Sequence, residues 1–203
     1  MTIGTRSVLF GVHSIFVHPF FVAAGWWRLY GFPCDVRLWV SFALHDIGYA
    51  GRNSMEGPEA ETHVELGARI IGKLFGTDWA ECRRHSRYYA RSRGLRISRL
   101  CVADKLAFVL TPAWLYLPLA RASGELWQYI ERSRDRQAGS EDFTAGEWSQ
   151  VNSGNPRAWL DGLQRFTYRW VLKNRFADEP DLRLTDRERA DFVDRRATEQ
   201  PYS

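Results

Sequence analysis

Residues 37–49 read RLWVSFALHDIGY, an apolar segment that ends in a histidine, an aspartate and a glycine. Leu38 and Phe42 are four residues apart, the spacing of one face of a helix. His45 and Asp46 close that face. A carboxylate that turns toward apolar neighbours is costly unless it is paired or binds a cation. The segment therefore predicts a helix that ends in two inward-facing polar residues, His45 and Asp46, which need a partner or a bound cation.

The same spacing of apolar residues recurs along nearly the whole chain, so we expect an all-α fold. The chain has 203 residues, of which 45% are apolar and 26% are charged. These values are typical of one globular domain, and they exclude disorder, collagen-like repeats and a disulfide-stapled miniprotein. We expect a single domain over residues 1–203, with a core of about 10–130 and C-terminal helices within 156–198 that pack on it.

Proline, glycine and capping residues divide the chain into segments. We expect helices over residues 19–30, 35–48, 60–75, 77–91, 98–111, 113–133, 156–176 and 184–198. Thr77 is the expected cap of one of them, and Pro118 is expected to kink another. Residues 50–59 contain Gly, Asn, Ser and Pro, and residues 135–155 are rich in Gly, Ser and Asp. We expect the first segment to be an ordered loop and the second to be a surface loop.

The N-terminal segment is apolar but interrupted. His13, His18, Pro19 and Arg28 leave no stretch of about 20 uninterrupted apolar residues, so we expect no transmembrane segment. The three cysteines are Cys34, Cys82 and Cys101. Their odd number and their spacing fit neither a disulfide framework nor a zinc motif, so we expect reduced thiols and a cytoplasmic protein.

The charge balance points to the class of partner. A net charge of +4 and a pI of about 9.1 are compatible with a small anionic substrate. The surplus is too small to indicate sequence-specific binding of nucleic acid, and we expect none. A homo-oligomer stays possible, because nothing in the sequence decides the oligomeric state.

Several histidines and aspartates share helical faces with apolar residues. His63 is in phase with Leu66, Gly67, Ile70 and Leu74. His85 is in phase with Cys82, and Asp104 with Cys101. One buried histidine alone is usually satisfied by an ordinary hydrogen bond. Four histidines and two aspartates on consecutive inner faces instead predict a metal centre, because a cation accepts neutral imidazole and ionised carboxylate together.

The order of these residues resembles the signature of the HD-domain superfamily of metal-dependent phosphohydrolases. It reads His18, His45-Asp46, His63, His85, Asp104. The local sequences are similar too: HDIGY at 45–49, HVELGARII at 63–71 and VADKLA at 102–107. The resemblance covers about residues 10–130 and implies an HD-type helical bundle. The elements around the third and fourth histidines resemble the dinuclear branch, which includes cyclic-dinucleotide phosphodiesterases and a few di-iron oxygenases.

The resemblance implies one or two divalent transition-metal ions, with Mn, Fe, Co, Ni and Zn not distinguished. The implied ligands of one ion are His18, His45 and Asp104, and those of the second are His63 and His85, with Asp46 as a bridge. A single ion on His18, His45, Asp46 and Asp104 is an alternative. His13 is the fallback for the first histidine.

The implied activity is hydrolysis of a phosphate ester or anhydride, with a nucleotide as the favoured substrate, by a metal-activated hydroxide. Asp46, His45 and Lys105 are the expected catalytic residues. The chain lacks a Gly-Tyr-Pro motif after His85 and a Glu-Asp pair soon after Asp46. These departures disfavour cyclic-dinucleotide and alarmone hydrolysis. A di-iron oxygenase and a non-catalytic nucleotide-binding module are the alternatives.

Basic and aromatic residues near these positions are candidates for substrate contacts. Seven arginines and no acid lie between residues 83 and 99. Arg87 is the expected phosphate contact, because an arginine fork matches phosphate oxygens. Arg52 lies in the loop after the His-Asp pair, where a substrate would approach. The candidates for stacking on a base are Tyr49, Trp26 and Trp27.

Overall fold

A computed structural model describes residues 1–55, 60–76, 79–135 and 142–176. Its α-helices are α1 (Ile3–Phe10), α2 (His18–Tyr30), α3 (Val36–Leu44), α4 (Val64–Phe75), α5 (Arg87–Ser92), α6 (Arg99–Leu110), α7 (Ala113–Ser123), α8 (Glu125–Asp135), α9 (Ala145–Val151) and α10 (Pro156–Asn174). Three 3₁₀ helices complete the set: η1 (Ile47–Tyr49), η2 (Ala60–His63) and η3 (Trp79–His85). These residues contain no strand, so the expected all-α, single-domain fold is confirmed for them.

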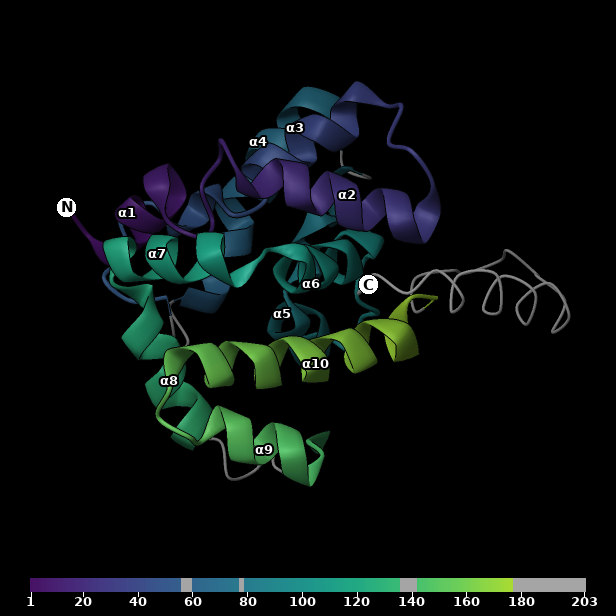
Figure 1. The fold of residues 1–203 in the computed structure, drawn as a ribbon. Coiled ribbons are helices and arrows are strands. Elements are labelled where there is room, and N and C mark those ends of the chain that lie inside the picture. The colour runs from purple at the N-terminus through teal and green to yellow at the C-terminus, as the bar shows by residue number, and fades with distance from the viewer. Residues whose placement is uncertain (56–59, 77–78, 136–141, 177–203) are drawn as a thin grey trace, which may run out of the picture.

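Helices α2 and α6 pack against each other at the centre of the molecule. A glycine allows their close approach, since a Cβ on Gly25 would lie 2.6 Å from the carbonyl oxygen of Ala103. Figure 1 shows α3 and α4 on one side of this pair and α10 crossing on the other, with α8 and α9 beyond α10. The central pair therefore lies between α3 and α4 on one side and α10 on the other, while α7 packs against α1.

Helix α10 begins where the sequence predicts it. The Asn155 side chain accepts hydrogen bonds from the backbone N–H groups of Arg157 (2.8 Å) and Ala158 (3.2 Å), and Pro156 occupies the first turn. Leu160 on its inner face is fully buried, and burial of one leucine contributes about 1.5–3 kcal/mol. The helix packs on α6 and α9. The further helix expected over 184–198 lies outside the described residues.

The single kinked helix expected over 113–133 is two helices. Pro118 lies inside α7. The chain changes direction at Gly124, which has a φ of +88° and ends α7 in the left-handed conformation that favours glycine. The sequence analysis placed the change of direction at Pro118, whereas the structure places it at Gly124.

The loop expected over 135–155 contains a helix. Thr144 accepts a hydrogen bond from the Glu147 N–H, and the Glu147 carboxylate accepts one from the Thr144 N–H at 2.8 Å. This reciprocal pair is a capping box, and it starts α9. The prediction of a loop there was wrong for residues 145–151.

The helix expected over 77–91 is also divided. Thr77, its expected cap, lies outside the described residues. The chain forms η3 and then α5, and the Ser86 side chain caps α5 by accepting a hydrogen bond from the Tyr89 N–H at 3.1 Å. His85 therefore ends a 3₁₀ helix instead of lying within an α-helix.

Within the described ranges, each helix taken alone is too short or too polar to cross a membrane. Helices α6 and α7 reach the required length and hydropathy only as a pair. That pair is bent by 104°.

Candidate metal centre

The His-Asp pair lies at the end of α3. Asp35 caps this helix by accepting a hydrogen bond from the Arg37 N–H at 2.9 Å. The α-helix ends at Leu44, before the expected Gly48, and η1 follows. Gly48 packs directly on the next histidine, since a Cβ there would lie only 1.9 Å from the carbonyl oxygen of His63. This glycine therefore lets the chain bring the His-Asp pair beside His63.

His63 occupies a different position from the one that helical phase predicts. It ends η2, the 3₁₀ helix that precedes α4. The buried residues of α4 are Val64, Gly67, Ala68 and Ile71, whereas Leu66 and Leu74 are exposed. The expected face was right for Gly67 and wrong for Leu66 and Leu74, because the buried stripe of α4 is centred on Val64, Gly67, Ala68 and Ile71. His63 is nevertheless buried.

Three histidine rings are oriented in the same way. Each Nδ1 donates to the backbone carbonyl three residues earlier: His45 to Phe42 (3.0 Å), His63 to Ala60 (2.7 Å) and His85 to Cys82 (2.7 Å). The carbonyls assign the proton to Nδ1 and leave the Nε2 lone pair directed inward. Metal-binding histidines commonly donate their second ring nitrogen in this way.

The first group of donor atoms comes from His18, His45, Asp46 and Asp104. These four atoms all lie within 4.8 Å of one another. His18 Nε2 is 3.0 Å from Asp104 Oδ1, and His45 Nε2 is 3.2 Å from Asp46 Oδ2. Despite that proximity, His45 Nε2 makes no hydrogen bond within the described part of the chain. A buried nitrogen of this kind, facing two carboxylates, fits a bound cation.

The second group comes from Asp46, His63 and His85, again within 4.8 Å. His85 Nε2 is 3.1 Å and His63 Nε2 is 3.5 Å from Asp46 Oδ1. The two Nε2 atoms are only 3.0 Å apart. Because both Nδ1 atoms carry protons, the two lone pairs face each other. A cation between them would replace this repulsion by two attractive contacts.

Asp46 belongs to both groups. Its Oδ2 atom faces the first group and its Oδ1 atom faces the second. The structure thus brings all six expected ligands together, and both clusters could hold a metal ion. This arrangement is compatible with an HD-type site. The binding of an ion by these residues stays a prediction.

The charges at the centre suit metal binding. Burial raises the pKa of Asp46, but His45 outweighs it and holds this pKa well below its ordinary value. Burial lowers the pKa of His63 to about 3, and His85 adds to the effect. Burial also lowers the pKa of His45, but Asp46 and Asp104 outweigh it and raise that pKa to about 10. Ionised carboxylates and a neutral His63 are the forms that bind a cation. His45 instead carries a proton between the two carboxylates, and this proton has to leave when an ion binds its Nε2 atom.

His13 lies at the edge of the centre. Its Nε2 atom is 4.0 Å from Asp46 Oδ2, but the atom is not part of either donor group. Its Nδ1 atom is 3.1 Å from Glu125 Oε2 and 2.9 Å from the Ser7 hydroxyl. Between the two candidates for the first ligand, the structure places His18 in the donor group.

Glu125 is a buried acid that sequence reasoning missed. It is the first residue of α8 and has no exposed surface. Burial raises its pKa, but hydrogen bonds from His13, Ser123 and Tyr129 outweigh burial and lower the pKa below its ordinary value. Nothing in the local sequence ELWQYIERS marks this acid, because a glutamate at a helix start is usually a surface residue.

A cavity of about 630 Å³ opens from the centre. Its size is within the range of small-molecule sites. Four basic residues line it, namely Arg87, Arg91, Lys105 and Arg132. One face of α10 forms another part of its wall, with Trp159, Leu163, Phe166 and Trp170. The C-terminal helix therefore does more than cover the core, because it also encloses the space beside the centre.

Three of the residues expected near the substrate line this cavity. Lys105 Nζ is 2.7 Å from Asp104 Oδ2. The Arg87 guanidinium lies 5.1 Å from the centroid of the Trp170 ring. The Tyr49 ring stacks on His63 at 4.0 Å, so one of its faces is already covered. Their substrate roles stay predictions.

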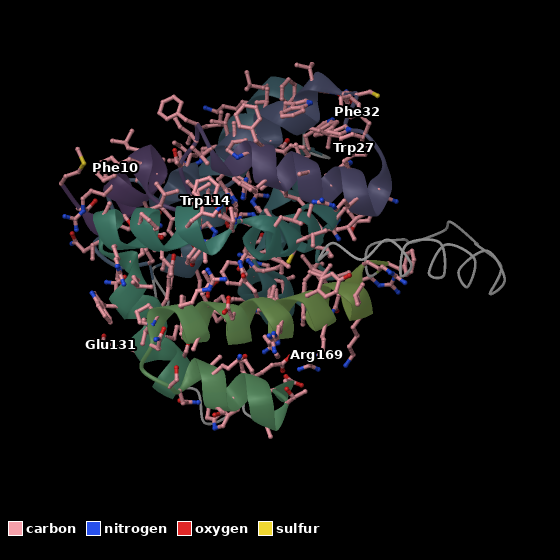
Figure 2. All side chains as sticks on the ribbon, viewed as in Figure 1. Phe10, Trp27, Phe32, Trp114, Glu131 and Arg169 are labelled. Atoms are coloured by element: carbon pink, nitrogen blue, oxygen red, sulfur yellow. The ribbon has the colours of Figure 1, made fainter. Side chains whose placement is uncertain are left out.

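The other expected contacts lie elsewhere. Arg52 donates to the Gly48 carbonyl (3.1 Å) and to the Thr62 hydroxyl (2.6 Å), and it does not line the cavity. It holds the loop after the His-Asp pair. Trp26 packs in the core, and Figure 2 shows Trp27 beside Phe32 at the periphery, where their rings are 5.6 Å apart. Their positions give no support to a role in stacking on a substrate.

No protein-family model, curated protein or solved structure matches the chain. The likeness to HD-domain proteins therefore rests on the order of six residues and on their convergence in space. The function has to be argued from the chemistry of the site itself.

Proposed function

We propose that the chain is a metal-dependent phosphohydrolase that acts on a phosphate ester or anhydride, with a nucleotide as the favoured substrate class. The observation that carries this proposal is the shared carboxylate of Asp46, whose two oxygens serve two adjacent donor groups. Divalent ions bound there would supply an acidified water and charge stabilisation at the phosphoryl oxygens.

The protein's own part is to hold the donors in place. The carbonyls of Phe42, Ala60 and Cys82 orient three imidazoles through their Nδ1 atoms. His18 and Lys105 both contact Asp104, at 3.0 Å and 2.7 Å. Donors that are fixed before the substrate arrives need no reorganisation during the reaction.

Positive charge beside the donor groups supports a phosphorylated substrate. Burial lowers the pKa of Lys105, but Asp104 outweighs it and raises this pKa, so the ammonium stays charged. Arg87 and Arg91 line the same cavity. In the proposed reaction Lys105 faces the charge that develops on the phosphoryl group, and Arg87 binds a phosphate oxygen.

The test couples metal analysis with a substrate screen. Protein purified without chelator is analysed for transition metals, then assayed with Mn²⁺ or Co²⁺ against nucleoside mono-, di- and triphosphates and cyclic dinucleotides. We expect bound metal and release of phosphate or a nucleotide product without oxygen. A metal-loaded protein that hydrolyses none of these substrates would contradict the proposal.

A di-iron oxygenase is the second candidate, because four imidazoles and two carboxylates also suit non-haem iron. Oxygen consumption in the presence of iron and a reductant, measured beside the hydrolysis screen, separates the two activities. A non-catalytic nucleotide-binding module predicts no turnover in the wild type and unchanged ligand affinity in Asp46→Ala.

A further inference from the structure

Two hydroxyls on the cavity wall make no hydrogen bond among the described residues, although the residues that carry them are buried. They belong to Tyr116 on α7 and Thr167 on α10, which are 6% and 8% exposed. Other hydroxyls on this wall are satisfied within the protein: Thr111 donates to the Ala107 carbonyl and Ser133 to that of Tyr129. Neither of these two oxygens is fully enclosed by protein, so both face the open space of the cavity, where they are available to pair with a bound molecule.

The surroundings of these hydroxyls are aromatic. The Tyr116 ring contacts Phe108 edge-on at 5.3 Å and lies 6.4 Å from Trp159. Trp159, Phe166 and Thr167 come from α10 and line the same cavity. A few polar groups on a mainly aromatic wall are typical of a site for a small organic molecule.

This wall is continuous with the charged end of the cavity. Arg87 joins the two, because its guanidinium lies over Trp170 of α10 and it lines the cavity together with Lys105 and Asp104. A molecule with a phosphate at the donor groups would thus extend its remaining part toward α7 and α10.

We propose that the α7–α10 wall binds the organic part of the substrate, and that this part is a planar heteroaromatic ring of the nucleobase kind. The inference rests on the proposed function, because it places the phosphate at the donor groups. Tyr116 and Thr167 can each donate or accept a hydrogen bond, so they pair with nitrogen and oxygen atoms on the edge of such a ring. Aromatic side chains pack against its faces. An alkyl chain would leave both hydroxyls unpaired.

The experiment measures binding by calorimetry to the full chain loaded with Mn²⁺. The probes are methylenephosphonate analogues of the four common nucleoside monophosphates, in which a methylene replaces the bridging ester oxygen and prevents hydrolysis. Hexylphosphonate supplies an alkyl chain, and methylphosphonate lacks an organic part. The variants are Thr167→Val and Tyr116→Phe, which keep the shape and remove one hydroxyl each. Tyr168→Phe is the matched control, since Tyr168 does not line the cavity.

We expect at least one nucleotide analogue to bind about tenfold or more tightly than methylphosphonate and more tightly than hexylphosphonate. Each hydroxyl deletion should weaken that analogue about three- to tenfold, the value of one hydrogen bond. Affinity for methylphosphonate should not change, and Tyr168→Phe should behave as the wild type.

Two results overturn the inference and leave the proposed function standing. One is equal affinity for the nucleotide analogues and methylphosphonate. The other is tight binding, of either hexylphosphonate or a nucleotide analogue, that is weakened by neither Thr167→Val nor Tyr116→Phe. Melting curves must show in that case that both variants are folded. If no phosphonate binds to a protein verified to contain metal, the proposed function fails as well.

Discussion

The N-terminal and C-terminal helices line the same cavity with side chains of different chemical types. The N-terminal region, up to α6, supplies six imidazole and carboxylate groups that could hold a metal ion, from five separate segments. The C-terminal region, α7 to α10, supplies aromatic rings and hydroxyls, among them those of Tyr116 and Thr167. A metal site is built from few residue types, whose order along the chain can be recognised. A cavity wall is built from the same apolar residues as a hydrophobic core, so the sequence does not distinguish the two. Only the first kind of site can be identified from one sequence.

The largest expected effect comes from the residue that the two donor groups share. Asp46→Ala removes a ligand from both, so we expect it to strip the metal and abolish hydrolysis. Metal content per chain and phosphate release are the measurements. Asp161→Ala is the control, because Asp161 pairs with the exposed Arg157 on α10. This variant should keep both its metal and its activity. Full metal content and full rate in Asp46→Ala would show that the N-terminal region is not the site.

The second expected effect concerns a glycine of the same region. A methyl group on Gly48 cannot fit beside the His63 carbonyl, so Gly48→Ala should destabilise the fold by about 1–3 kcal/mol or more and displace His63. Gly146→Ala is the control, since nothing lies within 4 Å of a Cβ there. On the exposed surface of α9 that change should stabilise by about 0.5–1 kcal/mol. Urea unfolding measures both, and equal values would refute the close approach.

Much of the N-terminal region follows from the sequence. The residues that donate to the centre were identified from their order and from the polar groups on apolar faces. The face predicted for His63 was only partly right, because Gly67 is buried whereas Leu66 and Leu74 are exposed. Apolar residues occur on both sides of this helix, so the sequence alone does not show which of them face the core.

The C-terminal region shows two reasons for missed features. The capping box of Thr144 and Glu147 was readable in the sequence, but a Gly- and Ser-rich context favoured a loop. Glu125 was not readable, since its partner His13 lies far away in the sequence, although Ser123 and Tyr129 are close to it. Local pattern can reveal the first kind of feature and not the second.

Metal removal tests whether the donor groups stabilise the whole molecule. A ligand that binds only the folded state at 100 times its Kd adds about 2.7 kcal/mol. For a chain of this size that corresponds to a fall in Tm of about 5–10 °C on chelation. Calorimetry of verified holo protein with and without chelator measures it. An unchanged Tm would mean that no ion at the centre contributes to the stability of the fold.

The smallest expected effect lies where the two regions meet. Glu125→Gln removes the charge that His13 faces, so we expect a loss of about 1–3 kcal/mol in the free energy of unfolding. Glu131→Gln is the control, an exposed glutamate on the same helix, which Figure 2 shows at the periphery. Equal losses in the two variants would show that the buried pair is not what joins α8 to the centre.

The pH dependence of that loss gives a sharper test. Because the pKa of Glu125 is lowered in the fold, its contribution is present above its ordinary value of 4.5 and is lost as the pH falls. Burial lowers the pKa of His13, but the hydrogen bond to Glu125 and nearby carboxylates outweigh it, so the pKa is raised. Its contribution is complete below 6.5 and is lost as the pH rises through the folded value. The difference between wild type and Glu125→Gln should therefore be greatest from about pH 4.5 to 6.5, and a difference that grows steadily above that window would contradict the pairing of His13 with Glu125.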